Sequence, residues 1–139
     1  MRITLESDYA LRIVSALAEE NMVVDAKTLS EKTFVTIRFT LKILHKLVTA
    51  DIVNSYKGVK GGYKLALDPR EITLKNIIEL IDGPIFIARC LEGGEGCSLN
   101  PDKSSCAFHH IFDTISLDVS RKLNKITIHD VITKNYTLI

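Results

Sequence analysis

The three cysteines of the chain, Cys90, Cys97 and Cys106, all lie in one polar stretch, CLEGGEGCSLNPDKSSC. His109 follows the last of them at a spacing of C-x2-H. Thiolates are the usual ligands of iron–sulfur clusters, and three thiolates with one imidazole also suit a tetrahedral zinc ion. The residue types and their spacing therefore indicate a metal site, with a cluster and a zinc ion both open at this point.

The cysteine count and the opening of the chain bear on the compartment. Three cysteines cannot all pair within one chain, and the opening MRITLESDYALRIVSALAEE is charged throughout, with no apolar run of signal-peptide length. No run of about eighteen apolar residues occurs, so we expect no membrane association. These features predict a cytoplasmic protein, whose reduced thiols favour metal ligation, reactive chemistry or plain burial over a disulfide framework.

Basic residues are concentrated in one part of the chain. The net charge of the 139 residues is only +1, but from Lys32 to Lys64 there are seven basic residues and one acidic residue, Asp51. A solvated helix surface can explain such a run. Binding to nucleic-acid phosphates explains it as well, provided that the segment has a shape that fits DNA.

The order of the expected elements supplies such a shape. Apolar residues recur at helical spacing over residues 4–20, which predicts an amphipathic first helix. Asp25 is expected to cap a short second helix, and Thr36 a third. Two strand-like stretches follow, at residues 52–56 and 63–67, joined by a basic, glycine-containing loop. This order predicts a winged helix-turn-helix fold, mainly α-helical with a small β-hairpin wing.

The third helix and the wing carry the candidate DNA contacts. One apolar stripe of the helix is expected to face the core: Ile37, Leu41, Ile43, Leu44, Leu47 and Val48. The other side holds the candidates for contacts with double-stranded DNA: Arg38, Lys42, His45 and Lys46. Lys57 and Lys60 of the wing are candidates for phosphate or minor-groove contacts. A basic helix followed by a basic wing favours DNA binding over a merely solvated surface.

A long helix is expected near the C-terminus. Thr73 can cap a fourth helix, LKNIIELID, and beyond Cys106 an apolar helical stripe continues to about Lys125, a length of about 30 Å. Such a helix on so small a domain would leave apolar surface exposed in a monomer, although it could also fold back on its own core. We expect a homodimer, whose two-fold symmetry would match a palindromic operator.

The chain is accordingly expected to have three parts. Residues 1–82 form the DNA-binding domain, residues 83–106 the cysteine loop, and residues 107–139 the dimerisation helix with a C-terminal segment. Three glycines of the loop would let its backbone wrap closely and point N–H groups at the sulfur atoms: Gly93, Gly94 and Gly96.

Several stretches together resemble a known family. ITLESDYALRIVSALA, YKGVKGGYKLA and ITLKNIIELIDGP, together with the three clustered cysteines, resemble the IscR/NsrR (Rrf-type) family of winged-helix iron–sulfur transcription regulators. The resemblance implies a homodimer in which Cys90, Cys97 and Cys106 hold a 2Fe–2S or 4Fe–4S cluster. The spacing here, C-x6-C-x8-C, is wider than the C-x5-C-x5-C typical of the family and leaves the cluster type open.

The resemblance also implies two candidates for the fourth ligand. His109 matches the histidine of the IscR type, and Asp8, within SDYALR, matches the aspartate that the NsrR type contributes from its first helix. An imidazole or a carboxylate binds iron less tightly than a thiolate. That position is therefore where nitric oxide, oxygen or a change of redox state could act. The sequence does not choose between His109 and Asp8.

Taken together, these features predict a homodimeric DNA-binding transcriptional regulator that senses iron–sulfur cluster status, redox state or nitric oxide. The alternative is a winged-helix regulator without a cluster, whose cysteines form a structural zinc site or a thiol switch. An enzyme is not expected, because three thiols in one loop exceed what a nucleophile needs. An electron carrier of the ferredoxin type would have four cysteines and no use for a basic wing.

Overall fold

The chain forms helices and one hairpin in the order that the sequence predicts. A computed structural model describes residues 2–93, 97–98 and 102–137; Gly94 and Gly96, expected to shape the cysteine loop, lie outside them. The described elements are α1 (Leu5–Glu20), α2 (Ala26–Thr33), α3 (Ile37–Thr49), β1 (Val53–Tyr56), β2 (Gly62–Leu65), α4 (Leu74–Asp82), η1 (Arg89–Leu91), η2 (Lys103–Ser105), α5 (Ala107–Lys125) and α6 (Ile128–Thr133). None of the described helices is long and apolar enough to cross a membrane.

Four helices begin at capping residues that are visible in the sequence. Thr4, Asp25, Thr36 and Thr73 each accept a hydrogen bond from a backbone N–H group in the first turn of the helix that follows. Such a bond satisfies one of the donors that a helix start leaves without a partner. The starts of α1, α2, α3 and α4 are thereby fixed by local chemistry, and the expected helix order is confirmed.

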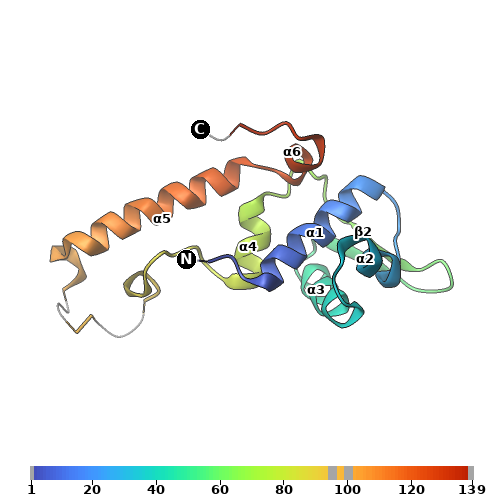
Figure 1. Cartoon of the computed structure of the whole chain (residues 1–139), viewed down its shortest axis with the longest axis horizontal. Helices are drawn as coiled ribbons and strands as arrows, with labels where there is room; N and C mark the ends of the chain where they lie inside the picture. The colour runs from blue at the N-terminus through green and yellow to red at the C-terminus, as the bar shows by residue number, and fades with distance from the viewer. Residues whose placement is uncertain (1, 94–96, 99–101, 138–139) are drawn as a thin grey trace.

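The core lies between α1, α3, α4 and the wing. α1 crosses the middle of this body in Figure 1, and it contacts α2, α3, α4, α6 and β2. Each fully buried Leu or Ile side chain stabilises the folded state by about 1.5–3 kcal/mol. The large side chains that are almost completely buried include Ile13, Leu17, Leu29, Ile43, Leu44, Leu47, Ile72, Ile77 and Ile128.

The expected inward stripe of α3 is partly wrong. Ile37 and Leu41 are 45% and 46% exposed, whereas Thr40 is completely buried. The buried face consists of Thr40 with Ile43, Leu44 and Leu47. Thr40 is tolerated inside because its hydroxyl donates to the Val35 carbonyl oxygen, which removes the cost of burying a polar group. The inner face of α3 is therefore rotated away from Ile37 and Leu41.

The wing is a two-stranded antiparallel hairpin held against the helical body. Its register runs from Val53 opposite Leu65 to Tyr56 opposite Gly62, within one or two residues of the expected strands. Tyr63 also pairs with Val24, just before α2, through N–H···O bonds of 2.9 and 2.8 Å. The wing is thus tied to the connection between α1 and α2.

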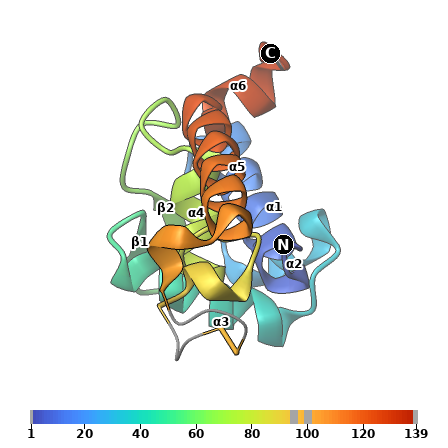
Figure 2. The ribbon, with the colours of Figure 1, turned by 90° about the vertical axis from the view of Figure 1, so that its left-hand side faces the viewer.

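The helix α5 ends at Lys125, as predicted, and extends away from the body. The cysteine segment (residues 83–106) leads from α4 to the start of α5. In Figures 1 and 2 its short helices η1 and η2 lie beside the end of α5 that is farther from α6. Only Ser116 of α5 is buried, and its hydroxyl accepts a bond from the Ile87 N–H. The apolar side chains Phe108, Ile111 and Ile115 are 65%, 52% and 44% exposed.

The short helix α6 was not predicted from the sequence. Thr127 and Asp130 form a capping box at its start, and the Ile128 N–H donates to the Ile72 carbonyl oxygen at 2.8 Å. Ile128 belongs to the same core cluster as the buried residues of α1 and α3. The chain after α5 therefore returns to the body and completes its core.

We predict that Ile128→Ala lowers the free energy of unfolding by about 2–5 kcal/mol, because it removes a fully buried side chain and leaves a cavity. Val59→Ala is the control, since Val59 is fully exposed and should leave stability unchanged. Urea denaturation followed by circular dichroism measures both. Equal midpoints for the two variants would show that α6 does not dock on the core as described.

Candidate DNA interface and cysteine segment

The outer surface of α3 is basic and accessible. Phe34 ends α2 in the left-handed conformation with φ of 56°, and this turn sends the chain into α3. Arg38, Lys42 and His45 are exposed and Lys46 is half-buried. All four lie on the side of α3 that does not enter the core, as the sequence predicts. A helix presented in this way has the placement of a recognition helix.

Two of these cations are engaged by a carboxylate of the first helix. The Lys42 Nζ lies 2.9 Å from Oε2 of Glu6, and the Lys46 Nζ lies 2.6 Å from Oε1 of the same side chain. The sequence analysis missed this contact, because 36 residues separate Glu6 from Lys42 and only the packing of α1 on α3 brings them together. Within the described residues, Arg38 has no carboxylate partner.

The tip of the wing presents two lysines. Lys57 and Lys60 are exposed, and no ion pair involves either of them within the described part of the chain. Gly58 has φ of 102°, and the Gly61 N–H donates to its carbonyl oxygen at 3.0 Å. A side chain at Gly61 would meet the Tyr56 carbonyl oxygen at 2.4 Å. The glycines thus permit a tight loop that leaves both lysines in solvent.

Asp8 lies on α1 and is already paired. Its Oδ2 accepts a bond from the Arg12 guanidinium at 2.5 Å, and both side chains are nearly half exposed. Arg12 also lies over the ring of Tyr9, which meets Phe39 of α3 edge to face. Asp8 therefore lies beside the contact of α1 with α3, whereas Cys90 and Cys106 lie on η1 and just before α5.

The cysteines lie on separate short pieces of backbone. Cys90 is in η1 and Cys106 precedes the first residue of α5, and both carry half-buried free thiols. Cys97 is exposed. Both η1 and η2 contact α5. Among the residues that the structure describes, no three His, Cys, Asp or Glu side chains lie together as a metal-binding group.

The two neighbouring histidines of α5 differ in their contacts. His110 places Nε2 2.7 Å from the Ser104 carbonyl oxygen. His109 is half-buried, and its Nδ1 is buried without a hydrogen-bond partner among the described residues. A buried ring nitrogen that lacks a partner is costly unless it binds something. Three thiols and an imidazole are residue types that ligate a metal or cluster, although the described residues do not gather them into one group. Of the two histidines, His109 has the ring nitrogen that is open to a ligand.

The residue that precedes the cysteine segment is bonded to the start of α1. Asp82, the last residue of α4, accepts bonds from both the N–H and the hydroxyl of Thr4, the N–H bond measuring 3.1 Å. Burial of Asp82 raises its pKa, but hydrogen bonds from Thr4 and Ser7, with the nearby charge of Lys46, together outweigh burial and hold the pKa below its usual value. The contact therefore persists at neutral pH.

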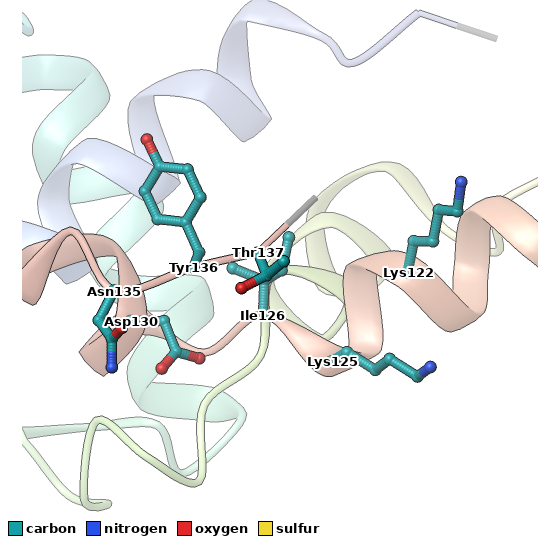
Figure 3. A pocket seen from close by; sticks show the side chains of 7 residues that line it. All are labelled: Lys122, Lys125, Ile126, Asp130, Asn135, Tyr136 and Thr137. Atoms are coloured by element: carbon teal, nitrogen blue, oxygen red, sulfur yellow. The ribbon is translucent and has the colours of Figure 1, made fainter. Parts of the chain in front are cut away.

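A surface hollow at the C-terminal end of α5 lies outside both candidate sites. It measures about 550 Å³ and lies between the end of α5 and the C-terminal residues (Figure 3). Lys122 and Lys125 extend outward from it, and Asp130 is already bonded to Thr127 in the capping box of α6. The described residues that line this hollow include no cysteine or histidine and none of the residues of α3.

The fold defines the class of protein. An exposed basic helix after a tight turn, followed by a basic hairpin, is a winged helix-turn-helix arrangement. The Rrf2 family model, described as an iron-dependent transcriptional regulator, matches residues 3–134. The chain belongs to this family and is a DNA-binding transcriptional regulator, as the sequence analysis predicts.

Individual relatives support the same assignment. The transcriptional regulator NsrR of Bacillus subtilis is 24% identical over 135 residues, which cover 95% of this chain and 90% of the relative. IscR of Aliivibrio salmonicida is 27% identical over 137 residues, covering 97% and 79%. The solved structure of CymR, the global cysteine regulator of B. subtilis, has a TM-score of 0.79 at 24% identity, covering 98% of this chain and 99% of that one. These proteins are regulators, and the expectation that the chain is not an enzyme is confirmed.

We predict that Gly62→Ala breaks the contact of the wing with the connection between α1 and α2 and so destabilises the fold. A Cβ at this position would lie 2.5 Å from the Val24 carbonyl oxygen, so the pairing of Val24 with Tyr63 must open. The expected cost is about 1–3 kcal/mol in the free energy of unfolding. Gly58→Ala controls for left-handed backbone, because a Cβ there meets nothing within 4 Å. Equal losses in thermal denaturation would contradict the steric explanation.

Proposed function

We propose that the protein is a homodimer that binds a palindromic operator and responds to the state of its cysteine segment. In each subunit α3 enters the major groove, with Arg38 and Lys42 near base edges and His45 and Lys46 beside them. The wing lies along the backbone with Lys57 and Lys60. The observation that carries this proposal is the combination, in one small chain, of an exposed basic α3 with a separate segment that holds all three thiols.

The cysteine segment is proposed to hold an iron–sulfur cluster. Cys90, Cys97 and Cys106 would be the thiolate ligands. His109 is the proposed fourth ligand, because its buried Nδ1 has no partner in the described structure, whereas Asp8 is paired with Arg12. When bound, such a cluster would supply iron that can react with oxygen or nitric oxide, or be oxidised and reduced. The names of the relatives IscR and NsrR agree with this assignment but leave the cluster type open.

The response is proposed to travel through α5. A change in residues 90–106 would move the start of α5 relative to α1, and so alter the distance between the two α3 helices of the dimer. The state of the cysteine segment can change DNA binding only if the protein has different affinities for DNA in the two states.

The proposed dimer interface is the apolar side of α5. Phe108, Ile111 and Ile115 lie on one side of the helix and are largely exposed, with Phe108 stacked on Phe112 at 6.3 Å between ring centroids. Apolar surface of this kind on a small domain is stabilised by covering it. A second copy of α5 presents the same surface, which suits a two-fold contact.

A thiol-based regulator is the second candidate function. Cys97 is exposed and the other two thiols are half-buried, so oxidants could reach the segment without any metal. The fold is also shared with CymR, the global cysteine regulator. A structural zinc site on the same residues is the third possibility, and metal analysis separates all three.

We predict that Lys57→Ala and Lys60→Ala each weaken binding by a similar factor on every duplex tested, because a phosphate contact carries no sequence information. Each should also reduce the slope of log K against log salt by about one. Lys75→Ala, on α4, is the control and should leave the slope unchanged. Fluorescence anisotropy over a salt series measures the slope, and an unchanged slope would remove that lysine from the interface.

We predict that anaerobically purified protein contains iron and sulfide in stoichiometric amounts, with visible thiolate-to-iron absorption that bleaches on exposure to nitric oxide or air. Cys97→Ser should lose most of the iron. His109→Ala should retain a more labile cluster, and His110→Ala, the matched control, should behave as the wild type because His110 already bonds the Ser104 carbonyl.

Three results would contradict this assignment. Zinc in place of iron would support the structural-site alternative, and colourless protein that stays colourless after reconstitution would support the thiol switch. Equal lability of the His109→Ala and His110→Ala proteins would show that His109 is not the fourth ligand.

We predict a dimer in light scattering and its loss in Ile111→Asp, which would leave a species of 15.5 kDa. A charge introduced into a covered apolar contact is costly because it cannot be solvated there. Leu117→Asp is the matched control: Leu117 is 47% exposed but lies on another side of α5. A wild-type protein of 15.5 kDa, or dissociation of both variants alike, would contradict the proposed interface.

A further inference from the structure

Glu6 occupies an unusual place for an acidic side chain. It lies in the first turn of α1, yet its two carboxylate oxygens each contact a different lysine of α3, at 2.9 Å for Lys42 and 2.6 Å for Lys46. Its side chain is only 22% exposed, whereas those of Lys42 and Lys46 are 52% and 36% exposed. The carboxylate is therefore enclosed by α1 and α3, while the two amines remain within reach of solvent.

The charge on Glu6 is maintained at neutral pH. Hydrogen bonds from Lys46 and Lys42 lower the pKa of the Glu6 carboxyl and outweigh the opposing effect of burial. A permanently ionised carboxylate thus neutralises one of two neighbouring positive charges. Among the described cations of α3, Arg38 is left without such a partner, and so are Lys57 and Lys60 of the wing.

A DNA phosphate offers these lysines the same chemistry as Glu6. Both groups are anionic and accept short bonds from ammonium N–H donors through paired oxygens. An ammonium group has three N–H donors, so it could contact a carboxylate and a phosphate together, but the two anions would then lie close to each other and repel. DNA must either displace Glu6 or bind beside an additional negative charge, and each alternative reduces the free energy gained on binding.

We propose that Glu6 competes with DNA phosphate for Lys42 and Lys46 and so lowers the affinity of the protein for DNA. Glu6 then weakens binding to DNA of any sequence. Arg38 and the wing lysines, which have no carboxylate partner in the described structure, can contact DNA without displacing an ion pair. This inference rests on the proposed use of α3 as the recognition helix, and it adds a residue of α1 to the interface.

The test compares Glu6→Gln with Glu19→Gln. Both remove one negative charge from α1, but Glu19 is exposed and lies at the other end of the helix, where salt screens its effect on α3. Binding to a labelled duplex of mixed sequence is measured by anisotropy between about 50 and 200 mM salt. We expect Glu6→Gln to bind several-fold more tightly, with a salt slope steeper by up to about one, and Glu19→Gln to match the wild type.

Two further variants keep the test decisive. Glu6→Asp retains the charge but shortens the side chain by one methylene, so it should change affinity in the same direction by less. In a Lys42→Ala/Lys46→Ala background, Glu6→Gln should raise affinity much less than in the wild type, because only the repulsion between Glu6 and DNA remains to be removed. Circular dichroism confirms that each variant is folded.

The outcomes separate this inference from the proposed function. Suppose that Glu6→Gln binds DNA as the wild type does or more weakly, while Lys42→Ala/Lys46→Ala binds more weakly than the wild type. That result would refute competition by Glu6 but keep α3 as the recognition helix. Weaker binding would show instead that Glu6 orients the lysines for DNA. No loss of affinity in Lys42→Ala/Lys46→Ala would overturn both the inference and the proposed use of α3.

Discussion

The first turn of α1 is the point on which the rest of the molecule depends. Thr4 caps the helix and is bonded to Asp82, the residue that precedes the cysteine segment. Two residues later, Glu6 contacts both Lys42 and Lys46 of α3. A single helical turn thus contacts both the end of α4, where the cysteine segment begins, and the helix proposed to enter DNA. A displacement at Asp82 would act on both.

In the remaining architecture, α5 and α6 join the cysteine segment to the body that carries α3. α5 carries the segment at one end and returns to the core through α6, where Ile128 is fully buried. Ser116 holds the backbone of Ile87 against the middle of α5. The chain from Asp82 to Ile87 is thus bonded to the start of α1 at one end and to α5 at the other. We propose that a change at the thiols beyond it acts on both helices.

The sequence predicts the elements well because their starts are local. The caps Asp25, Thr36 and Thr73 indicate the starts of three helices, apolar spacing indicates the first helix, and the glycines of the wing indicate a tight hairpin. Leu41 was wrongly assigned to the inner face of α3 because the periodicity considers only apolar residues. Thr40 is buried there instead, and its hydroxyl bonds the Val35 carbonyl oxygen, a contact that the sequence pattern does not show. The Glu6 ion pairs and the return of α6 depend on tertiary packing between distant residues, and for that reason they appear only in the structure.

The central claim is that DNA affinity reports the state of the cysteine segment. The most direct test is a titration of one operator duplex, selected from a random pool, with wild-type protein in two forms, one anaerobic and cluster-loaded and the other stripped of metal and reduced. We predict that the two forms differ in affinity by at least about tenfold, the effect of a coupling free energy of 1.4 kcal/mol. Identical titration curves for the two forms would contradict the claim.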